Sequence, residues 1–395
     1  HVVIGEKLYD AVYAARYTVG FEQLREKAGE YSPERVAKWT GISASDIVKL
    51  AREYATTHPA VIRLNYGVQR SEGGGMATRA VAMLPCITGS WQEIGGGLQL
   101  STSGAFASVG GEKVKRKDLM LKSLGREART VNMVELGKAL NTLDDPPIKA
   151  LFVYGSNPAA TCPNHNEVIR GLQRTDLFTV VHEQFMTDTT DYADLVLPAT
   201  TFFEHKDLQT AYGHYFLQVS DQAIEPLGEC RSNVEVFRAL AEGMGFDDEC
   251  FGESVDEMID SALESNHPWL EGITRERLER ESHIRMNFEK TTPGQNGADL
   301  PTKSYLPFLP FAHGNFFTAS GKAELYSESL KEQGLDPVVL FEPPAESRHG
   351  ERAKAFPLEF LARKADNFLN SSFSNLPVIQ KMEEPGLLEM NADDA

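Results

Sequence analysis

The chain has 395 residues, of which 41% are hydrophobic and 24% charged, and it carries a formal net charge of −18 at pH 7. This length predicts two or three compact units rather than one domain. The negative charge argues against binding nucleic acid through its phosphates, which requires a cationic surface, and no apolar run approaches the ~18 residues of a membrane span.

Strong local signals predict the first helices. Ser32 is a favourable N-cap with Pro33 at the first helical position, and Gly41 is suited to end that helix. Apolar positions at helical spacing predict the next helix over residues 46–57.

A strand–loop–helix unit of the α/β kind follows. Residues 60–64 predict a short strand, residues 65–69 form a turn that contains glycine, and a helix is expected from about residue 75 to residue 88. Residues 105–145 mix Gly, Lys and Arg around one further helix, which indicates a bridge between units.

The most regular part of the chain alternates strands with helices. Strands are predicted over 148–154, 177–181 and 194–198, and helices over 164–173 and 233–244. Strands separated by helices of this length predict a parallel, doubly wound sheet.

The remainder divides into an irregular part and a third unit. Residues 246–320 are acidic and rich in turn residues, so we expect an irregular, lid-like segment. A new apolar strand is predicted from Lys354 to Arg363. The fold class is therefore α/β, with two Rossmann-like units over 1–110 and 111–345, and the start of a third unit over 346–395.

Three predicted strands end in polar residues. Because ligands of doubly wound sheets bind at the carboxyl ends of the strands, these ends are candidate binding positions. Each has an ordinary explanation when taken alone, as a turn or a surface histidine. Their recurrence predicts a dinucleotide-type site. The three groups are Gly155 to Asn157, His182 with Glu183, and Glu204 to Lys206.

Other catalytic patterns are missing from the sequence. There is no G-x-S-x-G elbow, no phosphate loop of the G-x-x-x-x-G-K-[ST] type and no H-E-x-x-H pair. The four cysteines form no C-x-x-C pair, so an iron–sulfur or zinc site within this chain is not expected. A hydrolase or an ordinary nicotinamide dehydrogenase is not supported, and no catalytic residue or metal ligand is assigned.

An ordered set of runs resembles the molybdopterin oxidoreductases of the dimethyl-sulfoxide-reductase family. Near the start these are KLYD (7–10), YTVGF (17–21) and YGVQR (66–70). Later runs are LFVYGSNP (151–158), VVHE (180–183) with Thr187, ADLVLPA (193–199), EPLGECR (225–231), SGKAELYSE (320–328) and FLNSSF (368–373).

The resemblance implies a cofactor and its contacts. Members of the family bind a pair of molybdopterin guanine dinucleotides that chelate Mo or W, and they transfer an oxygen atom, or electrons and protons, with small substrates. By resemblance, Asn65 and Gln69 contact one pterin. The residues expected to hold a guanosine or its phosphates are Gly155, Asn157, His182 and Glu183, with Thr187, His205 and Asn233 beside them. Those expected in a barrel-like domain that grips both pterins are Arg363, Asn370, Ser371 and Ser372.

The resemblance also predicts what lies outside this chain. His1 and Ala395 read as internal positions of a longer protein. We expect the iron–sulfur region and the metal's protein ligand before His1, and the rest of the barrel-like domain after Ala395. The chain alone is then expected to be apo and inactive. Its compartment, cytoplasmic or periplasmic, would depend on residues before His1.

The same resemblance implies partners for the chain and leaves one alternative function. An iron–sulfur electron-transfer subunit and a small-molecule substrate are the expected partners. Residues 100–104 read LSTSG where formate dehydrogenases carry an Arg, which argues against formate. The alternative is a pterin-free structural electron-transfer subunit, similar to the large iron–sulfur subunit of respiratory complex I.

Overall fold

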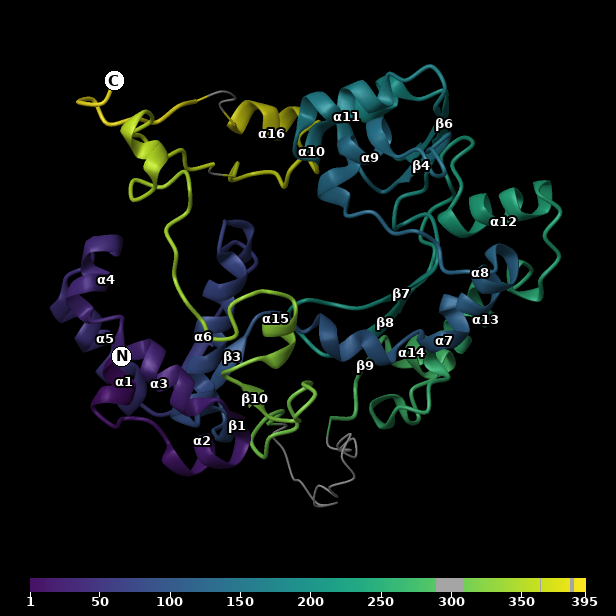
Figure 1. Ribbon diagram of the computed structural model, residues 1–395. Helices are drawn as coiled ribbons and strands as arrows, with labels where there is room; N and C mark the ends of the chain where they lie inside the picture. The colour runs from purple at the N-terminus through teal and green to yellow at the C-terminus, as the bar shows by residue number, and fades with distance from the viewer. Residues whose placement is uncertain (289–308, 363, 384–386) are drawn as a thin grey trace.

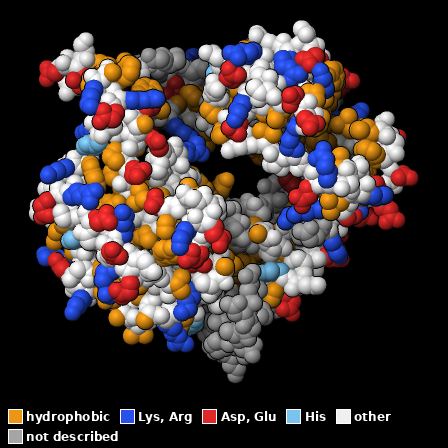
Figure 2. All heavy atoms as spheres, viewed as in Figure 1, with side chains coloured by type: hydrophobic (Ala, Val, Ile, Leu, Met, Phe, Trp, Pro, Cys, Tyr) orange, Lys and Arg blue, Asp and Glu red, His pale blue; other side chains and the backbone are white. Residues whose placement is uncertain are grey.

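The computed structural model describes residues 1–288, 309–362, 364–383 and 387–395. Their strands form four small sheets, two of two strands and two of three. Figure 1 shows three groups of elements arranged around an open centre, and Figure 2 shows a hollow at the middle of the same face. Acidic and basic side chains are interspersed over that face.

The first group is mainly helical. Ser32 caps α4 by accepting a hydrogen bond from the N–H of Arg35, and Gly41 ends the helix with a φ of +74°. Ser43 caps α5 in the same way, so the helix predictions in this region are confirmed. The helices are α1 (Val2–Gly5), α2 (Ala11–Tyr17), α3 (Phe21–Gly29), α4 (Pro33–Thr40) and α5 (Ala44–Thr56).

The predicted strand–loop–helix unit completes this group. Strand β2 (Val61–Arg63) pairs in parallel with β3 (Gly97–Gln99), and helix α6 (Gly74–Thr88) lies between them in sequence. The short 3₁₀ helix η1 (Val68–Arg70) precedes α6, and η2 (Ser90–Gln92) follows it.

The chain returns to this first group near its end. Strand β1 (Thr18–Val19) pairs in parallel with β10 (Ala323–Glu324), and Leu325 is fully buried in the same core as Leu24 and Met83. The Nη2 of Arg79 donates to the carbonyl oxygens of Glu324 and Pro337 at 3.2 and 2.8 Å. Residues 323–339 therefore pack on the first unit, although the predicted boundaries assigned them to the second. Helix α15 (Glu328–Glu332) belongs to the same return segment.

The second group is a parallel three-stranded sheet. Its strand order is β4 (Ala150–Tyr154), β5 (Phe178–Glu183) and β6 (Leu195–Pro198). Beside it lie η4 (Met133–Glu135), α9 (Leu136–Thr142), α10 (Pro158–Thr161), α11 (His165–Leu172) and η5 (Asp188–Tyr192).

Helices lie on both faces of this sheet. Leu151 of β4 packs with Leu140 of α9 and Val168 of α11. On the other face, the ring of Phe237 in α12 (Asn233–Gly243) lies 5.3 Å from the rings of both Phe152 and Tyr154. Alternate residues of β4 thus face opposite helical layers.

The third group corrects the prediction of an irregular segment over residues 246–320. Strands β7 (Asp207–Gln209), β8 (Phe216–Ser220) and β9 (His283–Arg285) form an antiparallel sheet. Its buried core combines Leu217 with Ile259, Leu278 and Phe106. Elements around it are η3 (Ser103–Ser108), α7 (Gly111–Lys115), α8 (Lys117–Leu124), η6 (Glu249–Phe251), α13 (Val255–Leu263), η7 (Pro268–Leu270) and α14 (Arg275–Glu281).

The helices within residues 246–288 could not be predicted from their local sequence alone. Ser254 and Glu257 form a capping box that starts α13, and Thr274 caps α14. These helices become stable by burying apolar residues against strands distant in sequence. The predicted boundary at residue 110 also fails to separate this group, because Phe106 lies in its core. Residues 289–308 lie outside the described residues.

The last segment contains η8 (Glu351–Lys354) and α16 (Pro377–Met382). The predicted strand from Lys354 to Arg363 is wrong for the part that the structure describes, since residues 355–362 are in no strand. Phe356 and Phe360 are 73% and 82% exposed there. Alternating apolar residues form a strand only against a partner strand, and the described residues supply none at this position. The barrel-like domain stays a prediction.

Candidate functional site

The carboxyl ends of β4, β5 and β6 lie side by side. Tyr154 is paired with His182, and His182 with Leu197. The loops that leave the three strands therefore start at one edge of the sheet. This edge, defined by the carboxyl ends of β4, β5 and β6, is called the β4–β6 edge below.

Gly155 leaves β4 with a left-handed backbone, at a φ of +55°. A Cβ atom added there would meet no heavy atom within 4 Å. The glycine is thus required by the backbone conformation and not by crowding. The space in front of it is open to a ligand.

Asn157 is buried at the start of α10, and its side chain is engaged within the protein. Its Oδ1 accepts hydrogen bonds from the N–H and the Oγ1 of Thr189, at 3.1 and 2.7 Å, and its Nδ2 donates to Asp188 at 2.9 Å. The amide therefore fixes the β4 loop to η5. Direct contact between Asn157 and a ligand stays a prediction, since these three bonds use most of its capacity.

His182 carries a polar atom without a partner. The ring is 1% exposed, and its Nδ1 lies 3.2 Å from the carbonyl oxygen of Leu197. A carbonyl oxygen only accepts, so Nδ1 carries a proton in this contact, and in the corresponding neutral tautomer Nε2 is an acceptor. Within the described part of the chain, Nε2 has no hydrogen-bond partner. A buried polar atom without a hydrogen bond lowers the stability of the fold, which points to a ligand group that would bond to Nε2.

Glu183 and Thr187 follow His182 along the chain. The Oγ1 of Thr187 is buried and, among the residues described, also lacks a partner. Glu183 ends β5, and one of its carboxylate oxygens accepts from the N–H of Gln184 at 2.7 Å. His182, Glu183 and Thr187 thus place three hydrogen-bonding groups close together in sequence at the end of β5.

The loop after β6 is held by its own hydrogen bonds. Thr200 Oγ1 lies 2.9 Å from Nδ1 of His205, and the buried carboxylate of Glu204 accepts from the N–H of Thr201 at 2.6 Å and from the N–H of Leu227 at 2.7 Å. These backbone donors hold the pKa of Glu204 below its ordinary value. Glu204 is therefore a framework carboxylate, and it fixes the backbone next to His205.

Asn233 reaches the same edge from α12. The N–H of Arg231 donates to the carbonyl oxygen of Pro198 at 3.1 Å, which brings the start of α12 to the end of β6. Ser232 caps the helix in a capping box with Glu235, and Asn233 is its exposed first residue. The structure therefore gathers at the β4–β6 edge seven of the predicted site residues: Gly155, Asn157, His182, Glu183, Thr187, His205 and Asn233.

Asn65 and Gln69 lie elsewhere, after β2 of the first group. Both are exposed, and the Oδ1 of Asn65 accepts from the N–H of Tyr66 at 2.8 Å. Gln69 lies in η1, which packs so closely on α6 that a Cβ at Gly74 would be 2.4 Å from the carbonyl oxygen of Val68. In the described part of the chain, no hydrogen bond joins Asn65 or Gln69 to the β4–β6 edge.

The predicted pterin residues near the chain's end lie in a tight turn. Leu369 and Ser372 are bridged by two backbone hydrogen bonds of 3.2 and 2.8 Å, and Asn370 has a φ of +53°. Ser371 is half-buried within this turn. Arg363 lies outside the described residues.

The sequence did not reveal two sets of contacts at or behind the site. Asp188 and Thr189 bind the amide of Asn157, and their nearness follows from the packing of η5 on α10. Lys206 is held by acidic residues of α13 and α14. Neither relationship has a local sequence signal.

Two further searches covered the described residues. They contain no group of three or more His, Cys, Asp or Glu side chains placed to hold a metal ion. None of their helices combines the length and apolar character needed to cross a membrane.

Comparisons with known proteins point to one family. The family profile for molybdopterin oxidoreductases matches residues 1–243. The probable oxidoreductase YoaE of Bacillus subtilis (strain 168) is 40% identical over 397 residues, which cover 100% of this chain and 54% of that protein. The dimethyl sulfoxide reductase DmsA of Escherichia coli (strain K12) is 26% identical, over 96% of this chain and 51% of its own length.

A solved structure supports the same relationship. The acetylene hydratase from Pelobacter acetylenicus superposes with a TM-score of 0.73 at 26% sequence identity, over 97% of this chain and 54% of that one. The chain thus spans about half the length of the curated relatives that it matches.

Proposed function

Because this chain belongs to the molybdopterin oxidoreductase family, we propose that it is part of a molybdenum or tungsten oxidoreductase and binds the nucleotide of a molybdopterin guanine dinucleotide at the β4–β6 edge. One observation carries the proposal. The buried Nε2 of His182 has no partner in the described part of the chain, at the edge where Gly155 leaves open space.

The groups at this edge suit the chemistry of a guanine nucleotide. A ribose hydroxyl can donate to the acceptor Nε2 of His182. The carboxylate of Glu183 can accept from the N–H groups of a guanine edge, and the open turn at Gly155 lets backbone approach a phosphate. The start of α12, beside Asn233, adds the partial positive charge of a helix N-terminus.

Other residues would hold the pterins. We assign Asn65 and Gln69 to one pterin, because both are exposed amides on the loop after β2, at the carboxyl end of a parallel strand. The turn with Asn370, Ser371 and Ser372 is assigned to the pterins with Arg363, on the resemblance alone. Amide and hydroxyl groups match the donors and acceptors of a pterin ring.

The chain's own residues bind and orient the cofactor, and none is assigned to bond breaking. When bound, the metal and its pterins would supply transfer of an oxygen atom, or of electrons and protons, with a small substrate. An iron–sulfur subunit would exchange the electrons. We place the protein in the cytoplasm or the periplasm.

A second reaction type is favoured by the structural similarity to acetylene hydratase, with its TM-score of 0.73. Addition of water to a small unsaturated substrate is therefore included among the activities to be assayed. The same cofactor site would serve either reaction, so the binding proposal is common to both.

Cofactor analysis of the protein tests the proposal. The complete protein to which this chain belongs is purified from cells that make the pterin cofactor, Mo and W are counted by mass spectrometry, and guanine nucleotide is released with acid. We expect Mo or W with about a twofold molar amount of GMP. Absence of both the metals and GMP would contradict the proposal and favour the pterin-free electron-transfer subunit.

A further inference from the structure

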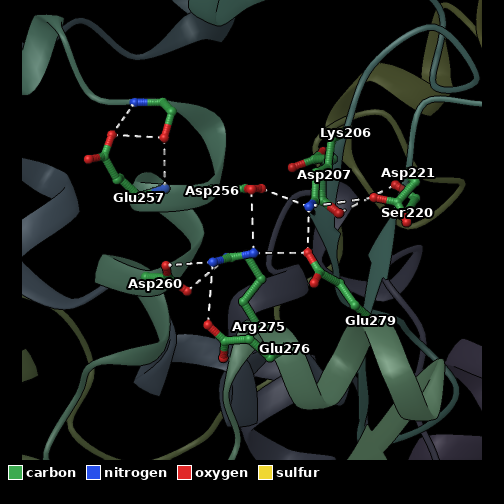
Figure 3. A network of polar contacts seen from close by, with 11 residues as sticks. Lys206, Asp207, Ser220, Asp221, Asp256, Glu257, Asp260, Arg275, Glu276 and Glu279 are labelled. Atoms are coloured by element: carbon green, nitrogen blue, oxygen red, sulfur yellow. Dashed lines mark hydrogen bonds and ion pairs between the residues drawn. The ribbon is translucent and has the colours of Figure 1, made fainter.

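Lys206 lies directly after His205, and its side chain enters a network of charged residues (Figure 3). Its Nζ is 2.7 Å from Asp256 of α13 and 2.6 Å from Glu279 of α14, with Asp221 at 3.5 Å. The side chain is 21% exposed. One lysine therefore joins the loop after β6 to two helices of the third group, α13 and α14.

Arg275 closes this network from the other side. Its Nη1 is 3.1 Å from Glu279 and 3.4 Å from Asp256, so the two cations share both carboxylates. Its Nε binds Asp260 at 3.0 Å. A shared network in a partly desolvated place holds its members more firmly than a single surface ion pair does.

The charges persist at neutral pH. Burial lowers the pKa of Lys206, but hydrogen bonds with Asp256 and Glu279 outweigh it and the net shift is upward. The hydrogen bond to Lys206 is in turn the main reason why the pKa values of Asp256 and Glu279 are lowered. All three groups are therefore ionised together.

The two neighbouring residues thus have different partners. His205 Nδ1 contacts Thr200 at 2.9 Å, at the end of β6. Lys206 contacts α13 and α14. One peptide unit separates the two side chains, so a shift of the Lys206 backbone moves His205 directly.

We propose that Lys206 is a positioning residue for the nucleotide site: its ion pairs with Asp256 and Glu279 hold His205 in place and make the third group part of the cofactor-binding apparatus. This inference rests on the proposed function. It assigns the α13–α14 pair a role in binding, although neither helix touches the β4–β6 edge through a described hydrogen bond.

The chain offers a matched control. Lys113 of α7 forms an ion pair of 2.6 Å with Glu264, the residue that follows α13. Lys113→Met removes an ion pair within the same group of elements but leaves the His205 loop untouched. Lys206→Arg keeps the charge and the reach, so it is the conservative variant.

The experiment uses the full chain produced in cells that lack the pterin cofactor, with GDP as the probe. Calorimetry measures GDP affinity, and hydrogen exchange measures protection of the amides of residues 199–206. We expect Lys206→Met to lower GDP affinity by about tenfold and to speed exchange in this loop. Lys206→Arg should restore most of both, and Lys113→Met should change neither.

The outcomes separate the two proposals. If the unmodified chain binds no GDP, the nucleotide assignment fails, and the role of Lys206 in binding fails with it. If the unmodified chain binds GDP and Lys206→Met binds it equally well, with unchanged exchange over residues 199–206, only the positioning role of Lys206 is overturned. Faster exchange without loss of affinity would also overturn it, because the lysine would then serve the fold alone.

Discussion

Asn157 and Thr189, 32 residues apart, are joined by a pair of hydrogen bonds beside the β4–β6 edge. The N–H and the hydroxyl of Thr189 both donate to the Oδ1 of Asn157, at 3.1 and 2.7 Å. Thr189 is fully buried, so no water can replace the acceptor. This contact fixes the loop after β4 against η5 and sets the backbone that leads from Gly155.

Removing that acceptor should destabilise the fold. Asn157→Ala leaves two buried donors of Thr189 unpaired, and we expect the free energy of unfolding to fall by about 1–3 kcal/mol. Urea unfolding measures the change. The exposed Asn65→Ala serves as the control and should stay within about 0.5 kcal/mol of the unmodified chain. Equal effects of the two substitutions would contradict the framework role of Asn157.

A substitution at Gly155 can separate the effect of backbone strain on stability from the effect of a blocked site on GDP binding. Gly155→Ala and Gly41→Ala place a Cβ in open space at left-handed positions, with φ of +55° and +74°. We expect each to lower the free energy of unfolding by a similar amount, about 1–2 kcal/mol. Only Gly155→Ala should weaken GDP binding, because its Cβ enters the space assigned to the ligand. Equal GDP affinity in both variants would contradict that assignment.

His182 tests the unpartnered nitrogen. His182→Phe keeps a buried ring but removes Nε2, and we expect a stability change within about 1 kcal/mol, because losing the bond to Leu197 is offset by losing an unsatisfied atom. GDP affinity should fall by about tenfold. His267→Phe, in the third group, is the control and should bind GDP as the unmodified chain does. If His182→Phe binds GDP as tightly as the unmodified chain, the His182 ring is not part of the nucleotide site.

The framework carboxylate Glu204 predicts a particular pH dependence. Hydrogen bonds lower its pKa in the folded protein below the ordinary value of 4.5. The stability that it contributes is therefore complete above about pH 4.5 and is lost as the pH falls through the lower folded pKa. Urea unfolding over this acid range should show the difference between the unmodified chain and Glu204→Gln shrinking as the pH falls. A difference that stays constant would contradict the charged role of Glu204.

Local signals were enough to predict much of the fold. Ser32, Pro33 and Gly41 specify both ends of α4 through groups adjacent in sequence. The alternation of strands and helices predicted the parallel β4–β5–β6 sheet with helices on both faces. The third group escaped prediction because its core joins Phe106 to Leu217 and Leu278, and no short window of sequence contains that relationship.

The candidate site also has a part that the sequence could predict and a part that it could not. His182 and His205 could be placed at one edge because parallel strands end together. The contacts that hold them could not: Asn157 meets Thr189 across 32 residues, and Lys206 meets Glu279 across 73. Such pairings depend on how whole elements pack. Binding by Asn65, Gln69 and the turn at Asn370 stays a prediction.

The most direct test of the central claim is a hydrogen-exchange comparison of the full chain, made without the pterin cofactor, in the presence and absence of GDP. The account predicts new protection confined to the loops of the β4–β6 edge, in residues 155–158, 183–190 and 199–206, and at the start of α12. Protection in other segments alone, or none at a GDP concentration that saturates calorimetric binding, would contradict a nucleotide site at this edge.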